Sequence, residues 1–419
     1  MEDRELCYSI IYDCAEKGAF SNLSLNQKGV DDFVRAAVYG TLTYVYAEDH
    51  IINKSAGKDV SSLDPKVRTI LRFGVWQLFF SDKVPDYAAV NTSVELAKKY
   101  AGRASGMVNA VLRKIALIPK EQRDLTNDKS PEAAFSLKPE IYGLIKKSYG
   151  KERAPSIARA LLKPSPLAIR VNTLKTDKPT LASELELEGF EVSLSSLSED
   201  ALIIRPSGDS PSIENSIAYK NGDFMVQGEG AQMASIIASP SEGMRMLDCC
   251  AAPGGKSTHL AQLTNNKADI TALDINASRV KLIDDNARRL GITSITAKVA
   301  DSVTYKDVEG FDLILCDAPC SGLGLIGSKP DIRLTITYDR IEQIRQKQRL
   351  ILDNMAGMVK DGGVLVYSTC TINKAENEDQ VTWFTEEHKE FITESQRTFF
   401  PDQDGCEGFF VARLRRNNG

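Results

Sequence analysis

The chain has 419 residues, of which 42% are hydrophobic and 26% charged, and its formal net charge is −5. This length favours two or three domains, and the mixed signs of the charges exclude a chain that is disordered throughout. A net negative charge also argues against general adhesion to nucleic acid, although a local basic groove is compatible with it.

Nothing in the sequence indicates export, a membrane anchor or a metal site. No apolar run approaches the length of a membrane span, and the acidic start Met1–Glu5 has no signal-peptide pattern. The eight cysteines are expected to be reduced thiols, and they do not combine with the three histidines into a zinc pattern. We therefore expect a cytoplasmic protein without membrane contact or bound metal, and we expect it to be a monomer.

Residues 1–122 are predicted to form an all-helical domain. Val90 and Val94 fall on one face of a helix, and Leu71–Leu78 belongs to a further helix. The polar stretch Glu121–Pro131 then indicates a linker.

Residues 132–225 are predicted to form a small α+β domain. Ile145–Leu162 has a helical pattern, and Leu167–Asn172 alternates like a strand. A second helix is expected at Leu181–Leu187, and a second strand at Leu202–Ile204.

Residues 226–419 are predicted to form an α/β domain of the Rossmann-like type, with a doubly wound parallel sheet. Apolar strands alternate there with amphipathic helices, the pattern typical of such sheets. The expected strands are Met244–Asp248, Ile270–Asp274, Ile295–Val299, Phe311–Cys316 and Gly363–Tyr367. A long helix, Asp339–Val359, is expected between the last two strands.

A glycine-rich turn follows the first of these strands, with the sequence Cys250-Ala251-Ala252-Pro253-Gly254-Gly255-Lys256. Small residues let a ligand approach the backbone, and the helix that follows offers free N–H groups. Asp274 ends the second strand, where an acidic residue typically binds ribose hydroxyls, and Asp301 after the third strand is placed to flank an adenine. An adenosyl ligand without a polyphosphate fits this pattern best.

Other interpretations of this turn remain open. Gly255-Lys256-Ser257 resembles the end of a phosphate-binding P-loop, but that motif needs glycine where this chain has Cys250. The dinucleotide pattern GxGxxG is absent, and a turn without any ligand is the remaining alternative.

Two cysteines about fifty residues apart also follow predicted strands. Cys320 lies in Asp317-Ala318-Pro319-Cys320, and Cys370 in Ser368-Thr369-Cys370. Because neighbouring strands of such a sheet end at one crevice, we expect Asp317 and both thiols to converge. A thiolate that adds to C6 of a cytosine makes C5 nucleophilic, and a carboxyl group at N3 would stabilise the developing charge. This argument does not rank the two thiols, and the alternative is that both are small buried hydrophobes.

These motifs resemble the RsmB/Sun group of bacterial ribosomal RNA cytosine-C5 methyltransferases over nearly the whole chain. The segments that resemble the group's NusB-like RNA-binding domain are Leu71–Leu78, Val84–Asn91, Val94–Lys98 and Val108–Arg113. Those that resemble its catalytic domain are Gln227–Ala231, Cys250–Lys256, Asp317–Gly322, Ser368–Cys370 and Gly408–Phe410, the last of which resembles the closing strand of that domain.

The resemblance implies a role for each matching residue. S-adenosylmethionine would be held by the Cys250–Lys256 loop, Asp274 and Asp301, while Asp317 would meet both cofactor and cytosine. Cys370 would be the nucleophile, and Cys320 would assist product release. The substrate would be small-subunit (16S) ribosomal RNA, with residues 1–122 and 132–225 positioning it.

One departure from the group concerns RNA contacts. Gly327 and Ser328 stand where the group often has two basic residues. The basic side chains that could replace a lost phosphate contact are Lys329, Arg333, Arg345, Lys347 and Arg349.

Two rival functions are an RNA-binding or antitermination factor with a vestigial Rossmann domain, and a P-loop-like ATPase.

Overall fold

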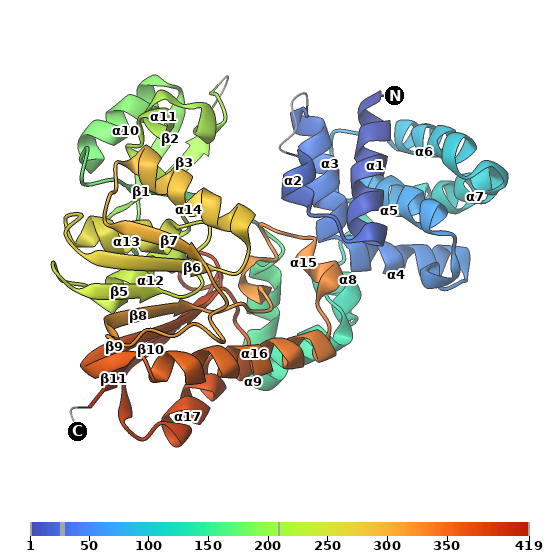
Figure 1. Cartoon of the computed structure of the whole chain (residues 1–419). Coiled ribbons are helices and arrows are strands. Elements are labelled where there is room, and N and C mark those ends of the chain that lie inside the picture. The colour runs from blue at the N-terminus through green and yellow to red at the C-terminus, as the bar shows by residue number, and fades with distance from the viewer. Residues whose placement is uncertain (1, 26–29, 208–209, 418–419) are drawn as a thin grey trace. The chain divides into compact units, whose positions relative to one another are not determined.

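The computed structural model describes residues 2–25, 30–207 and 210–417 and divides into two compact units (Figure 1). The first unit contains Met1–Pro164 and Leu325–Tyr338, and the second contains Ser165–Gly324 and Asp339–Gly419. The division into three functional domains stays a prediction.

The first unit is helical, as the sequence predicted for residues 1–122, and it also includes residues 132–164, which were predicted to belong to the α+β domain. Its helices are α1 (Glu2–Lys17), α2 (Ser21–Leu25), α3 (Asp32–Thr43), α4 (Val45–Ala56), α5 (Pro65–Phe79), α6 (Asp86–Tyr100), α7 (Ser105–Ala116), α8 (Pro131–Phe135), α9 (Pro139–Ala160) and α15 (Ile332–Thr335). Asp64 caps α5 by accepting the Lys66 N–H, and Pro65 occupies the first helical turn. Helix α5 is central, because nearly all its residues are buried. A Cβ on Gly74 would lie only 2.7 Å from Leu112, so glycine lets α5 and α7 approach closely.

The segment Leu325–Tyr338 leaves the second unit and belongs to the first. Arg333 is fully buried and donates hydrogen bonds to three carbonyl oxygens, those of Phe135, Ser136 and Leu161. Burial lowers the pKa of Arg333 to about 10. This arginine is therefore a structural group, and the expectation that it could contact RNA phosphate is wrong.

The departure at Gly327 also has a structural reason. A Cβ at Gly327 would collide with the carbonyl oxygen of Lys163. A basic side chain cannot occupy this position unless the backbone shifts.

A four-stranded antiparallel sheet opens the second unit, in the order β2-β3-β1-β4. Its elements are β1 (Leu167–Val171), α10 (Lys178–Leu187), β2 (Phe190–Leu194), β3 (Ala201–Pro206), α11 (Ile217–Asn221) and β4 (Phe224–Val226). The sequence predicted β1, α10 and β3, but not β2 and β4.

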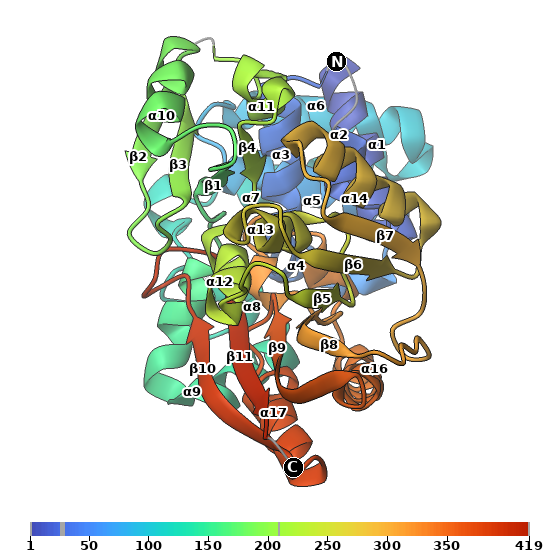
Figure 2. The same cartoon turned by 60° about the vertical axis from the view of Figure 1, so that its left-hand side comes forward.

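The rest of the second unit is a seven-stranded sheet with the order β10-β11-β9-β8-β5-β6-β7 (Figure 2). Its strands are β5 (Arg245–Asp248), β6 (Asp269–Asp274), β7 (Ile295–Val299), β8 (Phe311–Asp317), β9 (Val359–Thr369), β10 (Phe391–Phe399) and β11 (Phe409–Arg416). Strands β5 to β9 are parallel, as predicted, whereas β10 and β11 add an antiparallel edge. The sheet is therefore mixed and Rossmann-like.

Helices cover both faces of this sheet. Helices α12 (Glu229–Ala238), α13 (Gly255–Leu263) and α14 (Ala277–Leu290) pack on one face, and α16 (Tyr338–Ala356) and α17 (Glu378–Glu387) on the other. Alternate residues of β8 serve the two layers, since Leu313 and Leu315 face α12–α14 while Ile314 and Cys316 face α16. Because β5 to β9 run in the same direction, their carboxyl ends lie at one edge of the sheet, where ligands of such folds bind. No helix of the described residues is long and apolar enough to cross a membrane.

Candidate active site

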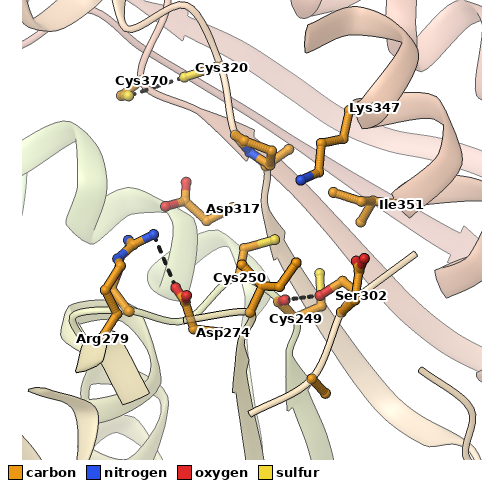
Figure 3. A pocket seen from close by; sticks show the side chains of 16 residues that line it. Cys249, Cys250, Asp274, Arg279, Ser302, Asp317, Cys320, Lys347, Ile351 and Cys370 are labelled. Carbon is orange, nitrogen blue, oxygen red and sulfur yellow. Dashed lines mark hydrogen bonds and ion pairs between the residues drawn. The ribbon is translucent and has the colours of Figure 1, made fainter. Parts of the chain in front are cut away.

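A pocket of about 300 Å³ lies at the carboxyl ends of β5, β6 and β8 (Figure 3). The predicted site residues that line it are Cys250, Ala252, Asp274, Asp301, Asp317, Cys320 and Cys370. The predicted residues that do not line it are Ala251, Pro253, Gly254, Gly255 and Lys256. The remaining lining residues are Cys249, Ile275, Arg279, Ala300, Ser302, Ala318, Pro319, Lys347 and Ile351.

The loop from Cys250 to Lys256 is tied to the sheet through its backbone. The Ala251 N–H donates to the carbonyl oxygen of Leu273 at 2.7 Å, which joins the loop to β6. Gly254 adopts φ +100° as the N-cap of α13, and a Cβ there would lie 3.2 Å from the Cα of Ile283. Helix α14 also contacts the loop, because Arg279 donates to the carbonyl oxygen of Ala252 at 2.8 Å. The loop therefore presents a fixed backbone at the pocket.

Asp274 is almost fully buried at the end of β6. Its Oδ1 accepts the Asn276 N–H at 2.9 Å, and its Oδ2 lies 3.2 Å from Arg279 (Figure 3). Arg279 was missed by the sequence reasoning, although its position in the first turn of the helix after Asp274 could have suggested it. Asp301, after β7, accepts the Val303 N–H at 2.9 Å. Two carboxylates thus lie at neighbouring strand ends beside the loop.

Lys256 and Asp317 form an ion pair between the loop and β8. The Nζ of Lys256 lies 2.6 Å from Oδ2 of Asp317, while Oδ1 accepts the Ser368 hydroxyl at 2.9 Å. Burial works to lower the pKa of Lys256, but attraction to Asp317, with Asp248 and Cys370 adding to it, raises that pKa above its ordinary value. Lys256 is therefore a permanent cation next to Asp317.

The two predicted reactive thiols are in direct contact. The Sγ atoms of Cys320 and Cys370 are 3.2 Å apart (Figure 3). The hydrogen bond to Cys370, followed by burial, holds the pKa of Cys320 well above its ordinary value. The other thiols outside the pocket lining, Cys7, Cys14, Cys316 and Cys406, are buried in hydrophobic cores.

A buried carboxyl group that the sequence reasoning missed lies beneath the loop. Asp248 ends β5, is fully buried, and accepts the Ser257 hydroxyl at 2.6 Å. Burial raises its pKa to about 7. No sequence signal sets this aspartate apart from an ordinary strand end.

The basic candidates on α16 differ in their contacts. Arg345 donates to the carbonyl oxygen of Ala375, and Arg349 donates to Gln380. Lys347 is exposed and extends from α16 toward the pocket (Figure 3). Of the three, Lys347 is therefore the best placed to meet a bound ligand. Among the described residues, no group of three or more potential ligands could hold a metal ion.

Three family models match successive parts of the chain. Residues 1–117 match the NusB family, residues 141–209 match an RsmF/B-like ferredoxin-like domain, and residues 235–415 match the 16S rRNA methyltransferase RsmB/F. In chain order, the first match lies within the helical unit, the second includes most of α9 and strands β1 to β3, and the third covers the Rossmann-like sheet.

Relatives and solved structures agree with these matches. The "Probable ribosomal RNA small subunit methyltransferase B" of Bacillus subtilis is 34% identical and covers 99% of this chain and 98% of its own length. The "Ribosomal RNA small subunit methyltransferase B" of Vibrio cholerae is 31% identical, with 91% of this chain and 88% of its own length covered.

The crystal structure of PH0851 superposes with a TM-score of 0.82 at 27% identity, over 98% of both chains. That of NSun6 from Pyrococcus horikoshii with SFG gives a TM-score of 0.63 at 25% identity, over 68% of this chain and 100% of the other. With these likenesses extending over the full length, the chain belongs to the RsmB/F family of 16S rRNA methyltransferases.

Proposed function

We propose that this chain transfers a methyl group from S-adenosylmethionine to C5 of a cytosine in small-subunit ribosomal RNA. In this proposal Cys370 forms a transient covalent bond to C6 of the base. The observation that carries the proposal is the contact between Cys320 and Cys370, 3.2 Å apart, in the pocket that also contains Asp317.

The pocket suits an adenosyl group in size and in chemistry. Its volume of about 300 Å³ is at the lower end for small-molecule sites, and both apolar and carboxylate groups line it. The residues that would hold the cofactor are the loop Cys250–Lys256, Asp274, Asp301 and Asp317. Asp274 would accept from ribose hydroxyls, and S-adenosylmethionine would supply the methyl group. A P-loop role is disfavoured, because the lysine it would need for phosphates is paired with Asp317.

The pair of thiols can activate a cytosine that is otherwise unreactive at C5. The Cys370 thiolate would add to C6, and the electron pair displaced from the C5–C6 bond would make C5 nucleophilic toward the methyl group. Asp317 would accept from the amino group of the cytosine and orient the ring, while the Lys256 ammonium beside it would stabilise the negative charge that develops. The Cys320 S–H is placed to donate to this thiolate before the attack. Lys256 would balance the charge of Asp317 at 2.6 Å.

The same contact suits product release. The proton at C5 must leave, and its electron pair must re-form the C5–C6 bond while the Cys370–C6 bond breaks. The hydrogen bond to Cys370 and its charge are major reasons why the pKa of Cys320 is raised. Both vanish once Cys370 is bonded to carbon, so Cys320 becomes easier to ionise. It would lose its own proton to solvent and, as a thiolate, would take the proton from C5.

The remaining domains would position the RNA. We propose that residues 1–122 bind it as a NusB-like domain and that residues 132–225 orient it by backbone and shape. The target cytosine would enter the pocket unpaired or flipped from its stack.

Bisulfite sequencing of ribosomal RNA tests the proposal, using cells with and without this protein. We expect one protected cytosine in 16S ribosomal RNA that is lost when the protein is absent. An identical set of protected cytosines in both cell lines would refute the assigned substrate and product.

A further inference from the structure

The two cysteine loops are joined through the residues that directly follow the cysteines. Ser321 follows Cys320, Thr371 follows Cys370, and their hydroxyl oxygens are 2.8 Å apart. The Glu376 carboxylate binds the Ser321 member of this pair: Oε1 accepts the Ser321 N–H at 2.7 Å, and Oε2 accepts the Ser321 hydroxyl at 2.6 Å. Asn373 donates to the same Oε2 at 2.9 Å.

Glu376 is an unusual group to find at such a place. It is fully buried, and burial raises its pKa, while hydrogen bonds from Ser321 and Asn373 act in the opposite direction. Burying a carboxylate is costly unless several hydrogen bonds compensate it. Here those bonds come from both cysteine loops, so the carboxylate joins one loop to the other.

The neighbouring residue has a different task. Asn377 accepts the Thr369 hydroxyl at 2.6 Å and donates to the carbonyl oxygen of Thr371 at 2.9 Å. These two contacts lie on either side of Cys370 in the sequence, and neither involves the Cys320 loop. Backbone bonds also join the loops, including the Gly324 N–H to the carbonyl oxygen of Cys370 at 3.1 Å. Loss of the Glu376 carboxylate would therefore free Ser321, in the Cys320 loop, from two hydrogen bonds, while Asn377 would still hold the Cys370 loop.

We propose that Glu376 is a positioning residue that keeps Cys320 within reach of Cys370 and of the base, acting through Ser321 and Thr371. This role rests on the covalent mechanism proposed above. Without the carboxylate, Cys370 should still attack, while the step that needs Cys320 should slow. A displacement of about 1 Å is expected to slow such a step by on the order of a hundredfold.

The test compares covalent protein–RNA adducts on denaturing gels for Glu376→Ala, Glu376→Gln and Cys320→Ala. Glu376→Ala should accumulate adduct, as Cys320→Ala is also expected to do, with unchanged affinity for S-adenosylmethionine. Glu376→Gln should release product faster than Glu376→Ala but more slowly than the unaltered protein. Its amide oxygen can accept the Ser321 N–H, whereas its NH₂ group faces the Asn373 amide that donated to the carboxylate at 2.9 Å.

Glu378→Ala is the matched control, because this glutamate lies two residues further on and accepts from Thr398 instead. Ser321→Ala serves if Glu376→Ala fails to fold, since it removes the shared hydroxyl with little change in volume, and it too should accumulate adduct.

The outcomes separate this inference from the mechanism on which it rests. Adduct with Cys320→Ala, but normal turnover without adduct in the folded Glu376→Ala or in Ser321→Ala, would refute the positioning role alone. No adduct with any variant, including Cys320→Ala, would overturn the covalent mechanism and the positioning role together.

Discussion

Replacing Asp274 with asparagine tests the cofactor site with little disturbance of the fold. Asparagine keeps the oxygen that accepts the Asn276 N–H, a contact of 2.9 Å that shapes the turn into α14. The second oxygen becomes an NH₂ group, which cannot accept from a ribose hydroxyl and faces Arg279 unfavourably. The substitution thus removes the proposed ligand contact and preserves the local backbone.

The expected loss follows from the kind of bond that is removed. A hydrogen bond to a charged group contributes about 1.5–3 kcal/mol. The dissociation constant for S-adenosylmethionine should therefore rise by about ten- to a hundredfold. Titration calorimetry measures this directly.

Asp269→Asn is the control, because Asp269 begins the same strand at the end away from the pocket and is exposed. It should bind S-adenosylmethionine as the unaltered protein does. Equal affinity for Asp274→Asn and Asp269→Asn, with both folded, would mean that Asp274 is not the ribose ligand.

Three further predictions concern buried charge, backbone and domains. The folded pKa of Asp248, about 7, exceeds the ordinary 3.8, so its carboxyl stabilises the fold most at low pH and this contribution is lost as pH rises through 7. Urea unfolding should show Asp248→Asn gaining on the unaltered protein between about pH 4 and pH 7, by at most about 1.4 kcal/mol per pH unit, with no further gain above pH 7; parallel profiles between pH 4 and 7 would contradict the burial argument. Gly254→Ala should lower the melting temperature, because the strained backbone costs about 1–3 kcal/mol of folding free energy, and it should also weaken S-adenosylmethionine binding. Both effects should be larger than those of Gly243→Ala, because Gly243 also has a positive φ but a Cβ there meets nothing within 4 Å. Deleting residues 1–122 should spare S-adenosylmethionine binding and weaken activity on RNA; a folded truncation that no longer binds the cofactor would refute the domain division.

Strand periodicity was sufficient to predict much of the fold and the position of the pocket. Because parallel strands end at one edge, the apolar runs before Asp274, Asp317 and Cys370 already implied that these residues converge. At the antiparallel edge, β11 matches the closing strand that the resemblance at Gly408–Phe410 implied, whereas β10 was not predicted, since its exposed, polar pattern resembles a loop.

The remaining residues of the site depend on long-range contacts. Arg333 looks like a surface cation in the sequence, yet it is buried by carbonyl groups that lie about 170 to 200 residues away along the chain. Glu376 bonds to Ser321 across 55 residues, and no local pattern indicates that pairing. Asp248 acquires its raised pKa mainly from burial, with the charge of Asp317 adding to it, and periodicity can reveal neither.

The central claim is that Cys370 attacks the base and that Cys320 assists its release. The most direct measurement is a denaturing gel of Cys370→Ala and Cys320→Ala, each incubated with S-adenosylmethionine and small-subunit ribosomal RNA from cells lacking the protein. The account predicts a covalent protein–RNA band with Cys320→Ala, and neither a band nor methylation with Cys370→Ala. The opposite pattern would exchange the two roles, and full activity of both variants without any band would contradict covalent cysteine catalysis.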